Sequence, residues 1–256
     1  MSIPKVMIVT GGSRGIGAGV ARMAGARGFD VAVNYTSAAD AAESVCAEIV
    51  AAGGKAIAIQ ANVGDPQDVA NMFTKAEEAL GPVGYLINNA GISTMSPIAE
   101  FPIETVQRIV ETNLLGTIYC TREAAGRMST ARGGKGGVII NVSSISAVHG
   151  GMKHDTIYAA TKGGQDSFTR GVAKEVAQEG IRVCGMRPGI TRTEIWDTQY
   201  TPEEVRDFGR NAIPIGRLGE VEDMAQAILW LCSDEASYIT GEILNVSGAR
   251  EIFIPT

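Results

Sequence analysis

Short apolar runs alternate with longer amphipathic segments along most of the chain. The runs have the length of strands that are buried on both faces, and they predict strands at 5–10, 29–34, 56–61, 85–88, 138–142, 182–186 and 242–246. In the segments between them, apolar and small residues recur every three or four positions. This period predicts helices at 16–27, 38–52, 65–80, 103–127, 157–178 and 220–232.

The alternation of strands and helices predicts the architecture. Parallel strands joined by right-handed helical crossovers form a sheet with helices on both faces, so we expect an α/β fold with a doubly wound parallel sheet of seven strands. A chain of 256 residues is in the range of one such domain, which would span residues 1–256. In a sheet of this kind, ligands bind beyond the carboxyl ends of the strands, near the topological switch point.

Two stretches lack a clear period. The first, at about 191–218, is rich in Thr, Arg and Pro and predicts a substrate lid, with a loosely held helix pair or plain surface as the alternatives. The second is a glycine-rich loop at 133–137, to which the sequence assigns no function.

Composition and charge exclude several classes of protein. The chain has 32 glycines in 256 residues, above the average usage of about 7%, but they follow no three-residue period, so collagen is excluded. A formal net charge of −6 argues against nucleic acid as the main ligand. The longest apolar runs are far shorter than the ~20 residues that a membrane span needs, and no signal peptide precedes the first strand. The four cysteines lie among apolar neighbours without a CxxC pair, which indicates buried thiols in a reducing cytoplasm.

A glycine-rich turn joins the first strand to the first helix. Residues 10–17 read TGGSRGIG. Such glycines permit a sharp turn and a close approach of backbone to a pyrophosphate, which the free N–H groups of the helix then bind. The glycine spacing differs from G-x-G-x-x-G, so a purely structural turn is the alternative.

Tyr158 and Lys162 are spaced four apart in a predicted helix, so their side chains share one face. Reduction of a carbonyl needs a proton donor, and the reverse oxidation needs a base. The pKa of a free tyrosine is about 10, and a nearby ammonium group lowers it. The pair therefore suits this chemistry, although many ordinary helices contain such a pair.

Five motifs in order and register resemble the short-chain dehydrogenase/reductase family over essentially the whole chain. They are TGGSRGIG at 10–17, NNAG at 88–91, NVSS at 141–144, Tyr158-x-x-x-Lys162 and RPG at 187–189. The resemblance implies a Rossmann-type sheet, a nicotinamide cofactor and oxidoreductase activity.

The resemblance also implies the catalytic roles. Tyr158 would be the general acid/base, and Lys162 would lower its pKa and bind the nicotinamide ribose. Ser144 would orient the substrate oxygen. The gap from Ser144 to Tyr158 is one residue longer than is usual in the family, and Ile145, at the usual spacing, has no hydroxyl to bind that oxygen. Ser143 is the second choice for this role. Asn113 would hold a local irregularity in its helix and a water chain to the lysine.

The end of the second strand bears on the choice of cofactor. An acidic residue there binds the ribose hydroxyls of NAD and repels a 2′-phosphate. Residues 34–37 read NYTS, with no carboxylate before Asp40, and the Arg14 guanidinium suits a phosphate. We therefore expect NADP(H), with NAD as the alternative cofactor and a solvated surface charge as the alternative role of Arg14.

By the same resemblance, further residues would contact the cofactor along its length. Asn62 stands where the family usually has Asp, beside the adenine. No cluster has the spacing of metal ligands, so no metal is predicted. His149 and His154 are expected on the loop surface, with a substrate role as the alternative. The full predicted cofactor set is Gly11, Ser13, Arg14, Gly15, Ile16, Gly17, Asn34, Tyr35, Thr36, Ser37, Asn62, Val63, Asn89, Ala90, Gly91, Tyr158, Lys162, Pro188, Gly189, Ile190, Thr191 and Thr193.

These features predict an NADPH-dependent enzyme that reversibly reduces a ketone to a secondary alcohol. Narrower candidates are a 3-oxoacyl-carrier-protein reductase and a sugar dehydrogenase; a non-catalytic NADP-binding sensor or scaffold is the alternative class. A carrier protein would need a basic docking area, for which Arg127, Arg132 and Lys135 are candidates, although a solvated positive face explains them more simply. The resemblance implies a homotetramer, with a dimer next, assembled through helices 103–127 and 157–178 and the tail 251–256. No nucleic acid or membrane partner is expected.

Overall fold

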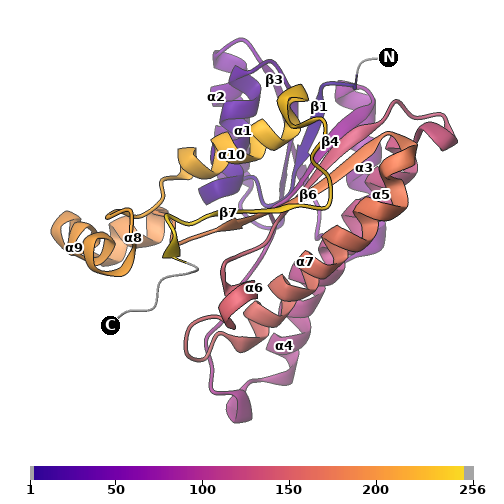
Figure 1. The fold of residues 1–256 in the computed structure, drawn as a ribbon. Coiled ribbons are helices and arrows are strands. Elements are labelled where there is room, and N and C mark those ends of the chain that lie inside the picture. The colour runs from indigo at the N-terminus through magenta and orange to yellow at the C-terminus, as the bar shows by residue number, and fades with distance from the viewer. Residues whose placement is uncertain (1–2, 251–256) are drawn as a thin grey trace.

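A sheet of seven parallel strands forms the centre of the protein (Figure 1). The computed structural model describes residues 3–250. The strand order is β3-β2-β1-β4-β5-β6-β7, so the chain reverses direction across the sheet between β1 and β4. The strands are β1 (Val6–Val9), β2 (Asp30–Tyr35), β3 (Lys55–Gln60), β4 (Val83–Asn88), β5 (Gly137–Val142), β6 (Ile181–Pro188) and β7 (Ile243–Val246). The predicted seven-stranded, doubly wound sheet is confirmed.

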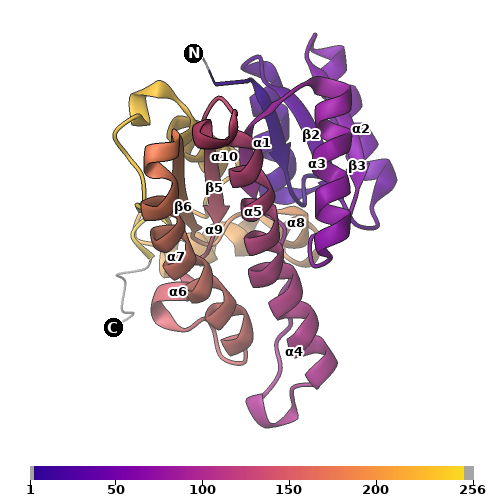
Figure 2. The ribbon, with the colours of Figure 1, turned by 90° about the vertical axis from the view of Figure 1, so that its right-hand side faces the viewer.

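Helices cover both faces of this sheet (Figure 2). One face is packed by α1 (Gly15–Ala26), α2 (Ala39–Ala51) and α10 (Val221–Cys232), the other by α3 (Pro66–Leu80), α5 (Gly116–Met128) and α7 (Thr156–Val176). Along β1, Met7 and Val9 join the first core and Val6 and Ile8 join the second. A strand buried on both sides needs apolar residues at every position, which explains the continuous apolar runs.

The helix predicted at 103–127 is interrupted. It consists of α4 (Ile103–Val110), a π-helical segment (Glu111–Leu115) and α5, and Asn113 lies in the π-helical segment. A π turn frees a backbone carbonyl from the regular ladder. Here the carbonyl of Asn113 accepts hydrogen bonds from Thr117 Oγ1 at 2.8 Å and from Gln165 Nε2 at 2.7 Å. The irregularity that the resemblance implied at Asn113 is therefore present.

The region at 191–218 contains two helices, α8 (Glu194–Gln199) and α9 (Pro202–Ala212). Val205, Ile213 and Leu218 form a small apolar cluster of their own. The pair projects from the carboxyl-end side of the sheet, apart from the main helical layers (Figure 1). The short elements elsewhere are α6 (Ser146–His149) and single 3₁₀ turns at Ile98–Glu100, Thr130–Arg132, Ala177–Glu179 and Asp234–Ala236.

The glycine-rich loop at 133–137 has a structural explanation that the sequence did not reveal. Gly133 and Gly136 adopt positive φ angles of 88° and 79°. A Cβ atom on Gly134 would lie 2.4 Å from the carbonyl oxygen of Arg127, and one on Gly137 would lie 2.4 Å from Sδ of Met128. Side chains are therefore excluded where the loop packs against the end of α5.

The four cysteines are buried free thiols, as predicted. Burial raises the pKa of Cys46 to about 11 and that of Cys232 to about 12, so both thiols stay protonated and unreactive. None of the helices within residues 3–250 has the length and apolar character to cross a membrane.

A buried chain of amides and hydroxyls ties the middle of the sheet to its helices. Asn88 Nδ2, at the end of β4, donates to Thr121 Oγ1 at 3.0 Å and to Asn141 Oδ1 at 2.9 Å. Asn141 Nδ2, on β5, donates to Thr169 Oγ1 of α7 at 2.9 Å. Because all four side chains are buried, each polar atom needs its partner.

Replacing Asn141 by Leu should destabilise the protein, because it removes the acceptor of Asn88 and the donor to Thr169 while keeping a side chain of similar size. We expect the free energy of unfolding in urea to fall by about 1–3 kcal/mol. The control is Val50→Ala at an exposed position of α2, for which a change within about 0.5 kcal/mol is expected. Equal values for the two variants would contradict this account.

Candidate active site

The glycine-rich turn touches the segment that follows β4. Gly11 and Gly15 have positive φ angles of 59° and 54°. A Cβ atom on Gly17 would lie 2.3 Å from the carbonyl oxygen of Gly11 and 2.5 Å from Nδ2 of Asn89. No side chain fits at residue 17 without moving backbone, so glycine is required where α1 begins.

Hydrogen bonds join the same two segments. Thr10 Oγ1 accepts from the backbone N–H groups of Asn89 and Ala90, both at 3.0 Å. Asn89 Nδ2 donates to the carbonyl oxygens of Thr10 at 3.0 Å and of Gly11 at 3.1 Å. The turn after β1 and the segment after β4 thus form one unit at the switch point of the sheet.

This unit fits a dinucleotide pyrophosphate. Arg14 is the N-cap residue of α1, and no side chain caps the helix there. The first N–H groups of α1 therefore face a turn whose glycines carry no side chains, which is an anion site of the kind that dinucleotide-binding helices provide. Arg14, Thr36 and Ser37 are exposed, and Ser13 and Tyr35 are partly buried.

Asn34 lies beneath the glycine-rich turn. Its side chain is buried, with Oδ1 accepting from the N–H of Gly11 at 3.1 Å. Its Nδ2 donates to the carbonyl oxygens of Ala61 at 3.0 Å and of Ile59 at 3.3 Å. The Asn34 side chain therefore supports the glycine-rich turn from inside, because its polar atoms are bonded to the backbone around it; the predicted cofactor contact of this residue stays a prediction.

Of the two predicted cofactor residues that follow β3, one is exposed and the other is buried. Asn62 is exposed, and its Oδ1 accepts from the N–H of Gly64 at 3.1 Å. Val63 is buried in the core between the sheet and α3 and α5. Only the Asn62 side chain is therefore placed on the surface of the groove.

Ser144, Tyr158 and Lys162 meet at the carboxyl end of β5. The Ser144 hydroxyl accepts a hydrogen bond from the N–H of Ser146 at 3.0 Å and lies near enough to Tyr158 to lower its pKa. Lys162 Nζ donates to the carbonyl oxygen of Val142 at 2.8 Å and lies 5.5 Å from the centre of the Tyr158 ring. The structure thus brings together the three residues that the sequence singled out.

The structure also separates the two serines. Ser143 is buried, and its hydroxyl donates to the carbonyl oxygen of Lys162 at 3.1 Å. Successive residues of an extended chain point to opposite sides, so only one of the pair can face Tyr158. The residue near Tyr158 is Ser144, while the Ser143 hydroxyl is bonded beneath α7.

Burial shifts the pKa values of both Tyr158 and Lys162. It raises the pKa of Tyr158, as does the negative charge of Asp155, while the hydrogen bond to Ser144 opposes this. Burial lowers the pKa of Lys162 to about 8, against the charge of Asp166. The resemblance implied a lowered pKa for Tyr158; in the structure desolvation prevails, so the phenol is protonated at neutral pH.

Asn113 holds the segment after β4 in place. Its Oδ1 accepts from the N–H of Ile92 at 2.8 Å, and its Nδ2 donates to the carbonyl oxygen of Ile92 at 2.9 Å and to Thr161 Oγ1 at 3.2 Å. A Cβ atom on Gly91 would lie 3.5 Å from both Asn113 Oδ1 and Lys162 Nζ. Gly91 therefore lies between the asparagine and the lysine, at contact distance from both.

The segment after β6 returns to the glycine-rich turn. A Cβ atom on Gly189 would lie 2.6 Å from Cα of Ser247, and one on Gly15 would lie 3.6 Å from the methyl group of Thr193. Thr191 Oγ1 donates to the carbonyl oxygen of Gly189 at 3.2 Å. The segment after β6 thus approaches the glycine-rich turn, and Gly15 and Thr193 line one pocket.

Sequence reasoning missed Ser93 and Asp155. Ser93 Oγ donates to Asp155 Oδ1 at 2.6 Å, and Asp155 is almost completely buried. An Asp three residues before Tyr158 was the available signal, but at the start of a helix it resembles a simple cap. His149 and His154 are exposed. Among the side chains that the structure describes, no group of three or more His, Cys, Asp or Glu residues could hold a metal ion.

Comparison with known proteins identifies the family. A family model described as enoyl-(acyl carrier protein) reductase matches residues 11–248. The structure also superposes on a double mutant of a Serratia marcescens short-chain dehydrogenase/reductase, with a TM-score of 0.88, 30% identity and coverage of 98% of this chain and 100% of that one. The chain belongs to the short-chain dehydrogenase/reductase family.

Two relatives resemble this short-chain dehydrogenase/reductase over nearly all of their length. It is 42% identical to the uncharacterized oxidoreductase YgfF of Escherichia coli K12, over 96% of this chain and 99% of the relative. It is 40% identical to an L-rhamnose 1-dehydrogenase (NAD(P)(+)) of Sphingomonas sp. SKA58, over 97% of this chain and 96% of the relative. The family comprises oxidoreductases that act on alcohols and ketones with nicotinamide cofactors.

Proposed function

We propose that this protein is an NADPH-dependent carbonyl reductase that also oxidises the corresponding secondary alcohol. The observation that carries the proposal is the Ser144–Tyr158–Lys162 cluster, which the segment after β4 connects to the glycine-rich turn. When bound, NADPH supplies the hydride that reduces the carbonyl carbon. A non-catalytic sensor would need the groove but not this cluster.

The side chains of the chain supply the proton and the orientation. Ser144 Oγ holds the carbonyl oxygen, and the Tyr158 phenol donates its proton to that oxygen as negative charge develops there. The raised pKa of Tyr158 keeps the donor protonated at neutral pH. The Lys162 ammonium, 5.5 Å from the ring, stabilises the phenolate that remains and binds the nicotinamide ribose.

Other predicted features fit this activity. Arg127 is bound to Glu77 and Glu123 and lies over the ring of Phe73, so it is not free to receive an acidic carrier protein, which favours a small-molecule substrate. α8 and α9, at 191–218, would form the substrate lid, and the bridge between Thr191 and Gly219 would hold its base. The groove would belong to a single domain that works in the cytoplasm.

NADP(H) is the cofactor that the charges of the groove favour. Arg14 is exposed at the start of α1, and β2 ends without a carboxylate. A guanidinium group pairs with a phosphate in a planar, two-bonded geometry, whereas a carboxylate would repel it.

Replacing Arg14 by Ala should therefore weaken the use of NADPH. We expect kcat/KM for NADPH to fall at least tenfold and that for NADH to change less than threefold, because only the 2′-phosphate loses its partner. Arg27→Ala, at the far, exposed end of α1, is the control and should change neither. Equal losses with both cofactors would contradict the assignment of Arg14.

Replacing Tyr158 by Phe should abolish the reduction of activated ketones and quinones, with a loss of about 100-fold or more in kcat. Tyr238→Phe, at a fully exposed position, should keep the wild-type rate.

The wild-type enzyme should also show a pH dependence. Its kcat for reduction should stay level near neutral pH and fall as pH rises through about 8, where Lys162 loses its charge. Consumption of NADPH, followed by absorbance, measures the rate of the variants and the pH profile of the wild type. An active Tyr158→Phe variant would contradict the role of Tyr158 as proton donor, and a level profile to about pH 9 would contradict the role of the Lys162 charge.

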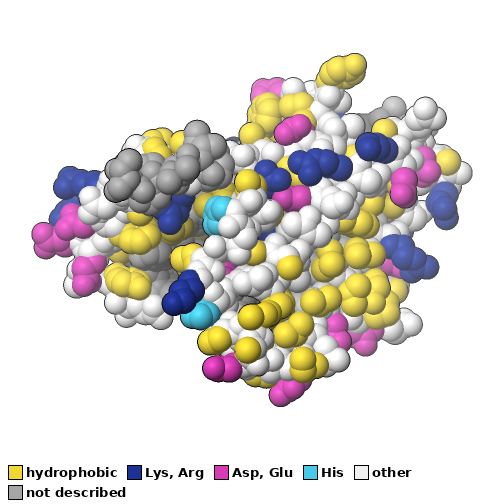
Figure 3. All heavy atoms as spheres, turned by 60° about the horizontal axis from the view of Figure 1, so that its bottom comes forward, with side chains coloured by type: hydrophobic (Ala, Val, Ile, Leu, Met, Phe, Trp, Pro, Cys, Tyr) yellow, Lys and Arg dark blue, Asp and Glu magenta, His cyan; other side chains and the backbone are white. Residues whose placement is uncertain are grey.

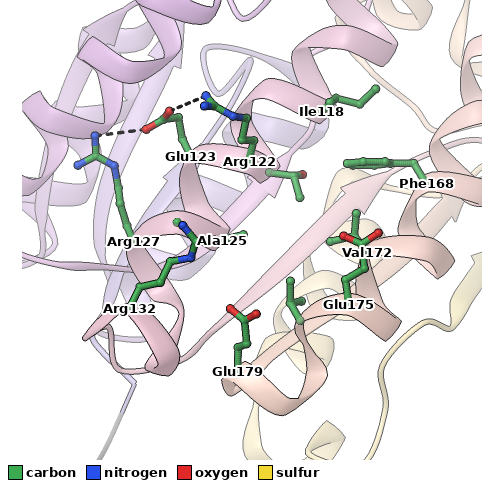
Figure 4. Close-up of a pocket in the computed structure, with 13 residues that line it drawn as sticks. Ile118, Arg122, Glu123, Ala125, Arg127, Arg132, Phe168, Val172, Glu175 and Glu179 are labelled. Carbon is green, nitrogen blue, oxygen red and sulfur yellow. Dashed lines mark hydrogen bonds and ion pairs between the residues drawn. The ribbon is translucent and has the colours of Figure 1, made fainter.

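A groove between α5 and α7 supports self-association (Figure 4). Its floor includes the apolar side chains of Ile118, Phe168 and Val172. In Figure 4, Arg122 and Arg132 of the α5 side and Glu175 and Glu179 of the α7 side border it. An apolar centre with both charges at its edge is self-complementary, as a two-fold interface requires.

Exposed hydrophobic residues continue this surface at the α4 and α6 end of the molecule. Met95, Ile98, Ile103, Val148 and Met152 are each more than half exposed. Figure 3 brings this end forward and shows hydrophobic side chains gathered there. Such a patch is typical of a protein interface, so we propose a homotetramer, with a dimer next; the tail that was also expected to contribute, 251–256, lies outside the described residues.

Replacing Phe168 by Asp should break the α5–α7 interface, because it places a charge in the apolar centre. We expect light scattering at micromolar concentration to give a tetramer or dimer for the wild type and a smaller species for this variant. Val50→Asp, on the opposite layer of helices, should keep the wild-type mass. A monomeric wild type would overturn the proposed assembly.

A further inference from the structure

A buried carboxylate, that of Asp155, lies near Tyr158 and has no contact with the substrate in the reaction proposed above. Asp155 immediately precedes α7 and is only 6% exposed. Tyr158 follows three residues later, on the same side of the first helical turn. The two groups are close enough for the charge of Asp155 to raise the pKa of Tyr158.

Asp155 does not cap the helix. Asp is a favoured N-cap residue because its side chain accepts from the first N–H groups, but no such hydrogen bond is present here. Its Oδ1 accepts instead from Ser93 Oγ at 2.6 Å, in the segment after β4. The N–H of Ser96 also donates to the carbonyl oxygen of His154 at 3.0 Å. Two loops that flank Tyr158 are thus joined, and they hold the carboxylate in a fixed position.

The second oxygen of Asp155 is available. Among the side chains that the structure describes, none donates a hydrogen bond to Oδ2 or forms an ion pair with Asp155, and Oδ2 is not one of the fully buried unpaired side-chain atoms, so a ligand can reach it. A carboxylate accepts several hydrogen bonds, and leaving a buried one with a single neutral donor is unfavourable. Burial accordingly raises the pKa of Asp155. A ligand that donates a hydrogen bond to Oδ2 would relieve this cost.

We propose that Asp155 determines substrate specificity: its Oδ2 accepts a hydrogen bond from a substrate hydroxyl close to the reacting carbonyl. This inference rests on the proposed reductase function and assigns the substrate to the sugars and related hydroxylated carbonyl compounds. The carbonyl carbon gains the hydride of NADPH and the carbonyl oxygen gains the proton of Tyr158. The hydroxyl bound to Asp155 is unchanged, so the product is a polyol.

A ketone without that hydroxyl should be a poor substrate. It would offer Oδ2 no hydrogen-bond donor in the transition state, and a site built to bind a substrate hydroxyl discriminates strongly against an analogue that lacks it. The matched pair is 2-hydroxycyclohexanone and cyclohexanone, which differ by one hydroxyl group next to the carbonyl. We expect wild-type kcat/KM to favour the hydroxyketone at least tenfold.

Asp155→Asn is the sharpest variant. Its amide oxygen can still accept from Ser93, whereas its NH₂ group replaces the acceptor Oδ2 by a donor. We expect kcat/KM for 2-hydroxycyclohexanone to fall at least tenfold, mainly through KM, and that for cyclohexanone to change less than threefold. Removing the charge also affects Tyr158, but that effect applies to both ketones, so the ratio isolates recognition of the hydroxyl.

Two further measurements keep the test decisive. NADPH affinity and the thermal unfolding midpoint of Asp155→Asn should match the wild type, and Asp155→Ala should show the same selective loss. Equal losses on both ketones would overturn the inference, because Asp155 would then act through Tyr158 or through the fold. A wild type that reduces activated ketones without preferring the hydroxyketone overturns this inference alone, whereas one inert toward all carbonyl compounds overturns the proposed function.

Discussion

The contact between the glycine-rich turn and the segment after β4 positions the rest of the site. Thr10 and Asn89 exchange hydrogen bonds across it, and Gly17 allows the two backbones to approach. The contact lies where the sheet reverses its strand order, so it closes one side of the crevice in which such folds bind ligands. It directs the start of α1 and the segment carrying Gly91 into the same groove.

Burial then gives the residues of that groove their chemical character. Desolvation favours the neutral forms of both Tyr158 and Lys162, in opposite directions on the pKa scale. A protonated phenol suits the reduction of a carbonyl, whereas the reverse oxidation needs the phenolate. The balance is set by neighbours from three different places: Ser144 after β5, Asp155 before α7 and Asp166 within it.

Local patterns predicted the fold well because a buried parallel sheet constrains its strands at every position. Each run of apolar residues became a strand, and each amphipathic segment became a helix. The main departure, the π-helical segment around Asn113, depends on Thr117 and on Gln165, and the second of these lies too far away in sequence for a local pattern to reveal the contact. The same limit applies to the loop at 133–137, where glycine is required by the packing against Arg127 and Met128.

The sequence by itself determined the architecture and the family, and it singled out the three residues that meet after β5, since these follow from periodicity and from motifs at fixed spacing. Tertiary structure decided which way individual side chains face. It turned Ser144 toward Tyr158 and Ser143 beneath α7, drew Asn34 inside the glycine-rich turn, and joined Asp155 to Ser93. The physical reason is that a side chain takes its orientation from hydrogen-bond partners that are distant in sequence. Its pKa depends in addition on how far folding excludes water from it. The immediate sequence neighbours of a residue determine neither the partners nor the burial.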